Sequence, residues 1–296
     1  MPTSPIAVWF LEPGNAATML RTVLHLDLAG ADAVVLPGEA DCPEALLLAA
    51  AASRRAPRIG LVAEISPWSR PPFLTARALG TLDALTRGRA GWFVSGRDTG
   101  TTCSDDSGRW SARTATAAER QDALADYLAA TAALGNSWEP DALVADVPSG
   151  RYVDADCVHV TNYHGPYFST RGPLNAPRPP QGRAVRFAEY RPNAAESDVA
   201  DVLVVGSEED IPAARASADR VLLKVAGEAA AAPPVTSADG YAFCGLTADR
   251  LLGQVLHETL PALVPVPRGG LLRDRFGLSA SDFEFVPYHA EQEVPV

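Results

Sequence analysis

The sequence predicts an α/β protein, most simply a (β/α)8 barrel formed by residues 1–296 as a single domain. Eight short β-rich runs recur along the chain, helical patterns separate most of them, and most of the runs are apolar at consecutive positions. Continuous apolar runs are typical of parallel strands that are covered on both faces. Strands that alternate with helices indicate a parallel sheet. Eight β units favour a closed barrel, with an open, doubly wound sheet as the alternative.

The expected strands follow one another in chain order at 6–11, 33–36, 59–65, 90–95, 184–188, 201–205, 220–225 and 240–244. Helical patterns occupy 16–29, 43–54, 72–86, 118–134, 208–218 and 247–263. Pro43 is expected in a first helical turn, where its missing N–H would have no partner in any case.

Two connections depart from this regular alternation. About 88 residues separate the fourth and fifth strands, far more than a normal βα loop, and predict a functional insertion over about 97–183. Within it, a hairpin is expected with strands at 158–161 and 167–171. After the seventh strand only a short Ala-rich stretch, 226–235, takes the place of a helix. The exposed strand surface there predicts self-association or a partner chain.

Composition narrows the class of function. The net charge of −11 disfavours nucleic acid and anionic membranes as partners, because no basic stripe offsets the negative field. The chain has neither a signal-like start nor a run of roughly 18 apolar residues. Its four cysteines, Cys42, Cys103, Cys157 and Cys244, form no CxxC pair, so a zinc site has no support. The expectation is a reduced, cytoplasmic protein.

Several segments carry a family resemblance, and GPLN followed by PQGR at 172–183 is the most specific of them. The others are RIGLVAEIS (58–66), TLDALTRGRAGWFV (81–94), LGNSWEPDAL (134–143), VHVTNYHGPYF (158–168) and RGGLLRDRFGL (268–278). In this order they resemble the bacterial-luciferase superfamily of flavin-dependent monooxygenases, in the branch of nitrilotriacetate, dibenzothiophene-sulfone and long-chain alkane monooxygenases. The chain resembles a shortened and divergent member.

The resemblance implies a TIM-type barrel that receives reduced FMN from a separate flavin reductase and oxygenates a small organic substrate through a flavin hydroperoxide. It also implies a homodimer or a heterodimer. Such chemistry needs a dry pocket and donors for the flavin phosphate at the C-terminal barrel face.

The polar flavin-facing positions of the family pattern are mostly replaced in this chain. Glu64 stands where strand three carries a small hydroxyl residue, and Phe93 replaces the Asn of a Trp-Asn pair. Of the His-x-x-Arg-Tyr helix motif only Arg120 remains, and the phosphate-binding segment after strand five reads AEYRP at 188–192. Within it, Arg191 could bind a phosphate bidentately.

The candidate catalytic residues are His164, a proton donor near neutral pH, and Glu64, a carboxylate at the end of an apolar strand. His164 could equally be a structural residue that fixes the hairpin, and Glu64 could pair with Arg97 or Arg191. The candidate cofactor-binding residues are Ser66, Phe93, Ser95, Arg97, Arg120 and Arg191. No metal site is expected.

Three functions stay open on this evidence. The first is an FMN-dependent monooxygenase with a divergent pocket. The second is a non-catalytic relative that serves as a partner subunit or as a flavin- or ligand-binding protein, which the replaced flavin positions favour. The third is a flavin-independent enzyme that uses Glu64 or His164 as acid or base. The fold cannot choose among them, because one barrel hosts many chemistries.

Overall fold

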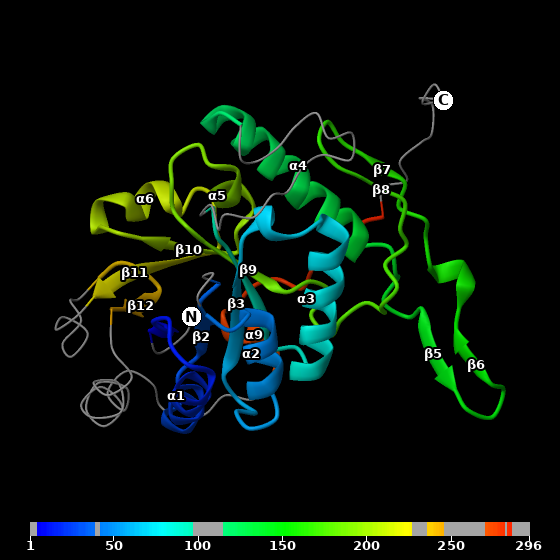
Figure 1. The fold of residues 1–296 in the computed structure, drawn as a ribbon, viewed down its shortest axis with the longest axis horizontal. Coiled ribbons are helices and arrows are strands. Elements are labelled where there is room, and N and C mark those ends of the chain that lie inside the picture. Colours follow the sequence, from blue (N-terminus) through cyan, green and yellow to red (C-terminus); the bar gives the residue numbers. More distant parts are fainter. Residues whose placement is uncertain are drawn as a thin grey trace.

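The structure is a computed structural model, which describes residues 5–38, 42–96, 115–226, 236–245, 270–281 and 283–285. Within these ranges eight parallel strands close into a barrel (Figure 1). Their hydrogen-bonded order is β1 (Ile6–Phe10), β12 (Gly240–Cys244), β11 (Arg220–Ala226), β10 (Val202–Val205), β9 (Val185–Glu189), β4 (Ala90–Val94), β3 (Gly60–Ile65) and β2 (Ala33–Leu36), which pairs with β1. Closure confirms the barrel and rules out the doubly wound sheet.

Helices cover the outside of the barrel. They are α1 (Ala16–Ala29), α2 (Ala45–Ala52), α3 (Pro72–Thr86), α4 (Ala117–Gly135), α5 (Ala195–Val199) and α6 (Ile211–Ala214). The predicted bounds of α1 and α3 are confirmed. Pro43 lies outside α2, whose N-cap is Glu44, so its placement in the first turn was wrong. A 3-10 helix, Glu208–Asp210, replaces the start of the helix expected at 208–218. Residues 227–235 and 247–263 lie outside the described ranges.

The core has two layers because successive strand residues face opposite sides. Val8, Val62, Phe187 and their neighbours on other strands fill the barrel interior. Trp9, Trp92 and other outward-facing residues pack beneath the helices, and Trp9 stacks on Phe243 with ring centroids 4.3 Å apart. Strands buried on both faces explain the continuous apolar runs in the sequence.

A short helix, α9 (Leu272–Arg275), closes the N-terminal end of the barrel. Leu272 and Phe276 belong to the interior core. The Leu272 N–H donates to the Gly88 carbonyl at 2.7 Å, and Arg220 Nε donates to the Phe276 carbonyl at 2.6 Å. A ligand of the barrel interior therefore has to enter at the opposite end, where the strands have their C-termini.

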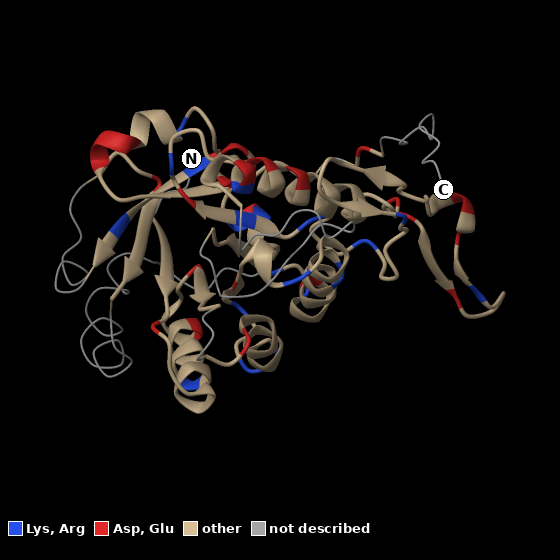
Figure 2. Cartoon of the chain, turned by 45° about the horizontal axis from the view of Figure 1, so that its top comes forward, with Lys and Arg blue, Asp and Glu red and all other residues tan. Residues whose placement is uncertain are grey.

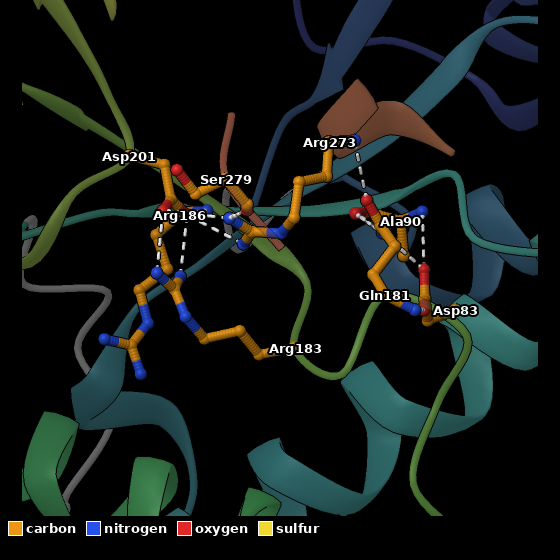
Figure 3. A network of polar contacts seen from close by, with 8 residues as sticks. All are labelled: Asp83, Ala90, Gln181, Arg183, Arg186, Asp201, Arg273 and Ser279. Atoms are coloured by element: carbon orange, nitrogen blue, oxygen red, sulfur yellow. Dashed lines mark hydrogen bonds and ion pairs between the residues drawn. The ribbon is translucent and has the colours of Figure 1, made fainter. Parts of the chain in front are cut away.

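The most specific sequence match, PQGR, belongs to this closed end (Figure 3). Gln181 donates to both carboxylate oxygens of Asp83, through its backbone N–H at 3.0 Å and its amide at 2.6 Å. Its amide oxygen accepts from the Arg273 N–H at 2.9 Å. Burial raises the pKa of Asp83, against the opposing effect of these hydrogen bonds. Gln181 thus joins α3 to α9, so this motif has a structural role.

Asp201 anchors a second part of the same network (Figure 3). Arg183 donates to its two carboxylate oxygens, at 2.7 Å each, and Arg273 approaches both at 3.4 Å. The Arg186 backbone N–H also donates to Asp201, at 2.8 Å. Burial alone would raise the pKa of Asp201, but the two guanidinium groups outweigh it and hold that pKa below its ordinary value.

Between β4 and β9 the described chain forms α4 and two small antiparallel sheets. One pairs β5 (Leu143–Asp146) with β6 (Arg151–Val153), which was not predicted, and the other pairs β7 (Tyr163–His164) with β8 (Ser169–Thr170). The expected hairpin strand at 158–161 was wrong. The backbone there pairs elsewhere, since the His159 N–H donates to the Ser137 carbonyl at 2.8 Å and Val158 bridges Trp138.

Asp126 on α4 holds the β7–β8 hairpin against the barrel. Its carboxylate accepts from the Tyr163 hydroxyl and from the backbone N–H groups of Tyr167 and Phe168, at 2.8 and 2.7 Å for the last two. A side chain at Gly165 would overlap the Asp126 carboxylate. The match at His164-Gly165 is therefore explained in part by the packing that Gly165 permits.

Candidate functional site

A cavity of about 320 Å³ opens at the C-terminal end of the barrel. Residues at or near the C-terminal ends of the eight barrel strands line it, from Phe10 and Glu12 at β1 round to Cys244 at β12. Barrel enzymes place their active sites at this end, because the loops that follow the strands meet there. Residues 97–114 and 246–269, which follow β4 and β12, lie outside the described ranges.

The inner wall of this mouth cavity is apolar. Phe93 and Val204 are buried, and the Phe10 ring meets the Phe93 ring edge to face with centroids 5.2 Å apart. Both phenylalanines point into the barrel, Phe10 from β1 and Phe93 from β4, and β2 and β3 lie between these two strands in the sheet. The two phenylalanines form an apolar floor beneath the polar rim.

Four carboxylates and two cations form the polar wall. Lys224 pairs with Glu189 at 2.9 Å, and Arg191 approaches Glu189 at 3.5 Å and Glu196 at 3.9 Å. The Gly245 N–H donates to Glu12 at 3.0 Å and so links the ends of β12 and β1. In the part of the chain that the structure describes, the mouth cavity is therefore rich in negative charge and both of its cations are paired.

Glu64 lies at this cavity, as the sequence predicted, and is half-buried. Its Oε2 accepts from the Gly38 N–H at 3.3 Å. A side chain at Gly38 would overlap the Glu64 carbonyl oxygen, which accounts for a glycine after β2. The backbone of one strand end thus orients a carboxylate that comes from the next.

Glu196 is a site residue that the sequence analysis missed. It follows β9 on the five-residue helix α5, and its side chain is only 3% exposed. Within the described ranges its Oε2 has no hydrogen-bond partner, although it borders the cavity. The only signal in the sequence is an acidic residue soon after a strand, which is too common to select.

The other predicted residues are divided between the cavity and its surroundings. Phe93, Ser95 and Arg191 line the cavity. The Ser66 hydroxyl instead accepts from the Trp68 N–H at 3.3 Å and caps the 3-10 helix Pro67–Ser69.

Two further predicted residues lie away from the described lining, and a third cannot be placed. Arg120 lies in the first turn of α4, and His164 is exposed on β7; neither is among the described residues that line the cavity. Arg97 lies outside the described residues.

Burial raises the pKa of the Cys244 thiol at the rim, with Glu12 and Glu189 adding to the rise and Lys224 opposing it. The thiol is therefore held in its neutral form, which is a poor nucleophile. Over the described residues, no group of three His, Cys, Asp or Glu side chains could hold a metal ion.

Charged residues occur on many elements of the fold. Figure 2 shows acidic positions along α4 and in the 3-10 helix that precedes α6. None of the helices that can be described is both long and apolar enough to cross a lipid bilayer.

An α/β barrel with its cavity at the C-terminal mouth is the architecture of a barrel enzyme. The family model for luciferase-like monooxygenases matches residues 4–260. The chain belongs to this family of monooxygenases.

Two sequence relatives differ in how much of their length is matched. A subunit of pristinamycin IIA synthase from Streptomyces pristinaespiralis is 31% identical over 81% of this chain and 82% of its own length. Dibenzothiophene-sulfone monooxygenase of Rhodococcus erythropolis is 38% identical, but over 43% of this chain and 27% of its own length.

Solved structures agree with the barrel fold. EDTA monooxygenase from Chelativorans sp. BNC1 superposes with a TM-score of 0.74 at 17% identity, covering 95% of this chain and 100% of that one. The long-chain alkane monooxygenase LadA gives 0.64 at 18% identity, covering 76% of this chain and 65% of LadA. At these identities the structural likeness establishes the fold and nothing finer.

Proposed function

We propose that this chain is the oxygenating component of a two-component system that takes reduced FMN from a separate flavin reductase and oxygenates a small organic substrate. The mouth cavity carries the proposal, because it combines an apolar floor at Phe10 and Phe93 with an oriented carboxylate at Glu64. Family membership supplies the reaction class. We treat residues 1–296 as a single domain in this proposal.

The described wall fits a flavin ring better than a flavin phosphate. Phe10, Phe93 and Val204 offer the apolar surface that the ring system needs, and Ser95 lies beside them. Arg191 and Lys224 already pair with carboxylates, so no described cation at the mouth is left for a phosphate dianion. When bound, a reduced flavin supplies the means to activate oxygen.

The chain's own residues would then have distinct roles. The phenylalanine floor would exclude water from the reacting atoms. Glu64, oriented by the Gly38 N–H, would hold or release a proton at its carboxyl group. We keep His164 as a second acid–base candidate and Arg97 and Arg120 as candidate phosphate contacts.

An anaerobic titration with reduced FMN, followed through tryptophan fluorescence, tests the proposal. We expect micromolar binding by the wild-type chain and weaker binding by Phe93→Leu, which removes an aromatic ring from the floor. Tyr152→Leu, on exposed β6, is the matched control and should bind as the wild type does. No binding of reduced FMN by the isolated wild-type chain would contradict the proposal.

A second candidate function is a subunit that needs a partner chain to complete its site. The observation that favours it is the match along most of the pristinamycin IIA synthase chain, which is by name one subunit of its synthase. The negative mouth cavity agrees with it, because a partner could supply the missing cation. Under this proposal, reduced FMN binds only after a second chain has been added, and sedimentation detects a heterodimer.

A further inference from the structure

A second cavity, of about 310 Å³, lies outside the barrel between α3, α4 and the outward faces of β4 and β9. Its space results from small residues on the two helices. Gly80 on α3 and Gly135 on α4 both border it, and a Cβ added to either would meet no atom within 4 Å. Trp92, Leu79 and Leu174 provide an apolar lining. We call it the outer cavity.

Arg186 on β9 borders this outer cavity and is buried, with 9% of its surface exposed. Val185 and Phe187 face the barrel interior, so Arg186 between them faces outward. Its backbone bonds to Asp201, but its guanidinium has no hydrogen bond or ion pair with any described residue. Figure 3 shows this side chain extending away from Asp201, past the Arg183 guanidinium.

The neighbouring charges do not neutralise Arg186. Asp201 already accepts hydrogen bonds from both terminal nitrogens of Arg183, and Arg273 approaches it as well. Asp219, the other carboxylate on the lining, is exposed. Burial, followed by the charge of Arg183, lowers the pKa of Arg186 to about 10 against the opposing effect of Asp201. Even so, Arg186 is cationic at neutral pH.

A buried cation without a partner is costly, and arginines in such places are normally paired. The planar guanidinium matches a carboxylate, which it can bind through two parallel hydrogen bonds. The cavity volume lies at the lower end of the range for small-molecule sites, which begins at roughly 300 Å³.

We propose that the outer cavity binds a small organic carboxylate, with its charged group on Arg186 and a short apolar body against Trp92, Leu79 and Leu174. This site is separate from the mouth cavity and does not depend on flavin binding. Its ligand class is a monocarboxylate whose apolar part is about as long as a short fatty acid.

Calorimetric titration of the full chain with hexanoate and hexanamide tests the proposal, because the two probes share a chain length and differ in charge. We expect saturable hexanoate binding and at least about tenfold weaker hexanamide binding, the ratio expected for losing one charge-assisted hydrogen bond. Arg186→Gln should weaken hexanoate binding by a similar factor. Gly80→Leu should abolish it by filling the space while leaving every charge in place.

Arg77→Gln, on the exposed side of α3, is the matched control and should bind hexanoate as the wild type does. If Arg186→Gln does not fold, the Gly80→Leu variant decides, since a larger side chain there meets open space. Equal binding by wild type and Gly80→Leu, or no saturable binding in the millimolar range, would overturn the proposal. Displacement of hexanoate by reduced FMN would overturn the separation of the two sites.

Discussion

Asp201→Asn tests whether the network at the closed end of the barrel stabilises the fold through charge. Asp201 is buried with its side chain 6% exposed, and it faces Arg183, which is 36% exposed, and Arg273, which is 4% exposed. Breaking a buried ion pair typically costs about 3–5 kcal/mol. Because Arg183 is partly solvated, we expect the lower end, about 3 kcal/mol less stability for the variant at pH 7.

The pH dependence of this loss gives a second test. The folded-state pKa of Asp201 lies below its ordinary value, so its stabilisation is present above the unfolded-state pKa of about 3.9. It is lost as the pH falls through the lower folded-state pKa. The difference in stability between wild type and Asp201→Asn should therefore be constant from neutral pH to about pH 4 and should shrink below it.

Urea unfolding followed by circular dichroism measures both quantities, and Asp198→Asn, an exposed neighbour, is the matched control. A loss below about 1 kcal/mol, as expected of a surface pair, would refute the assignment of Asp201 to a buried charge network. A difference that does not change between pH 7 and pH 3 would refute the electrostatic explanation, because the substitution would then act through packing or hydrogen-bond number alone.

Three further substitutions test the geometry of the mouth and of the core. Gly38→Ala should destabilise the fold and weaken ligand binding at the mouth, because its Cβ would overlap the backbone of Glu64. Thermal unfolding measures the loss of stability, and the FMN titration measures the loss of binding. Gly80→Ala, also a glycine substitution but in open space within a helix, should instead raise stability by about 0.5–1 kcal/mol in urea. Gln181→Leu leaves the buried Asp83 carboxylate without its amide donor and removes the acceptor of the Arg273 N–H. It should therefore lower the free energy of unfolding by about 2 kcal/mol in the same urea assay. An unchanged unfolding midpoint would contradict the bridging role of Gln181.

Local sequence patterns were enough to predict the barrel strands because each strand is short, apolar and covered on both faces. The expected bounds of β2 and β12 are those of the structure, and the others differ by one residue at one or both ends. Helices with well-defined ends, such as α1 with its N-cap Asn15 and its C-cap Gly30, could be predicted equally well. The first hairpin strand was misplaced at 158–161 because the backbone at Val158 and His159 pairs with Trp138 and Ser137, which are distant in the sequence.

The candidate site was only partly predictable. The end of a parallel strand can be recognised from local sequence, and for this reason four of the predicted residues, Glu64, Phe93, Ser95 and Arg191, lie at the barrel mouth. Their roles there stay predictions. Ser66 could not be separated from them, because a cap and a ligand contact use the same hydroxyl. The absence of His164 from the described lining is a matter of hairpin orientation, which Asp126 fixes through three hydrogen bonds.

The sequence by itself determined the barrel, its order of strands and helices, and the family to which the chain belongs, since these depend on periodic burial and on motifs that are local in the chain. Only the tertiary structure decided which charges meet. Glu196 reaches the mouth and Arg186 reaches the outer cavity because a closed sheet sends alternate residues to opposite faces and brings distant loops together. The pairing of a buried charge depends on neighbours far apart in sequence, and no local pattern records them.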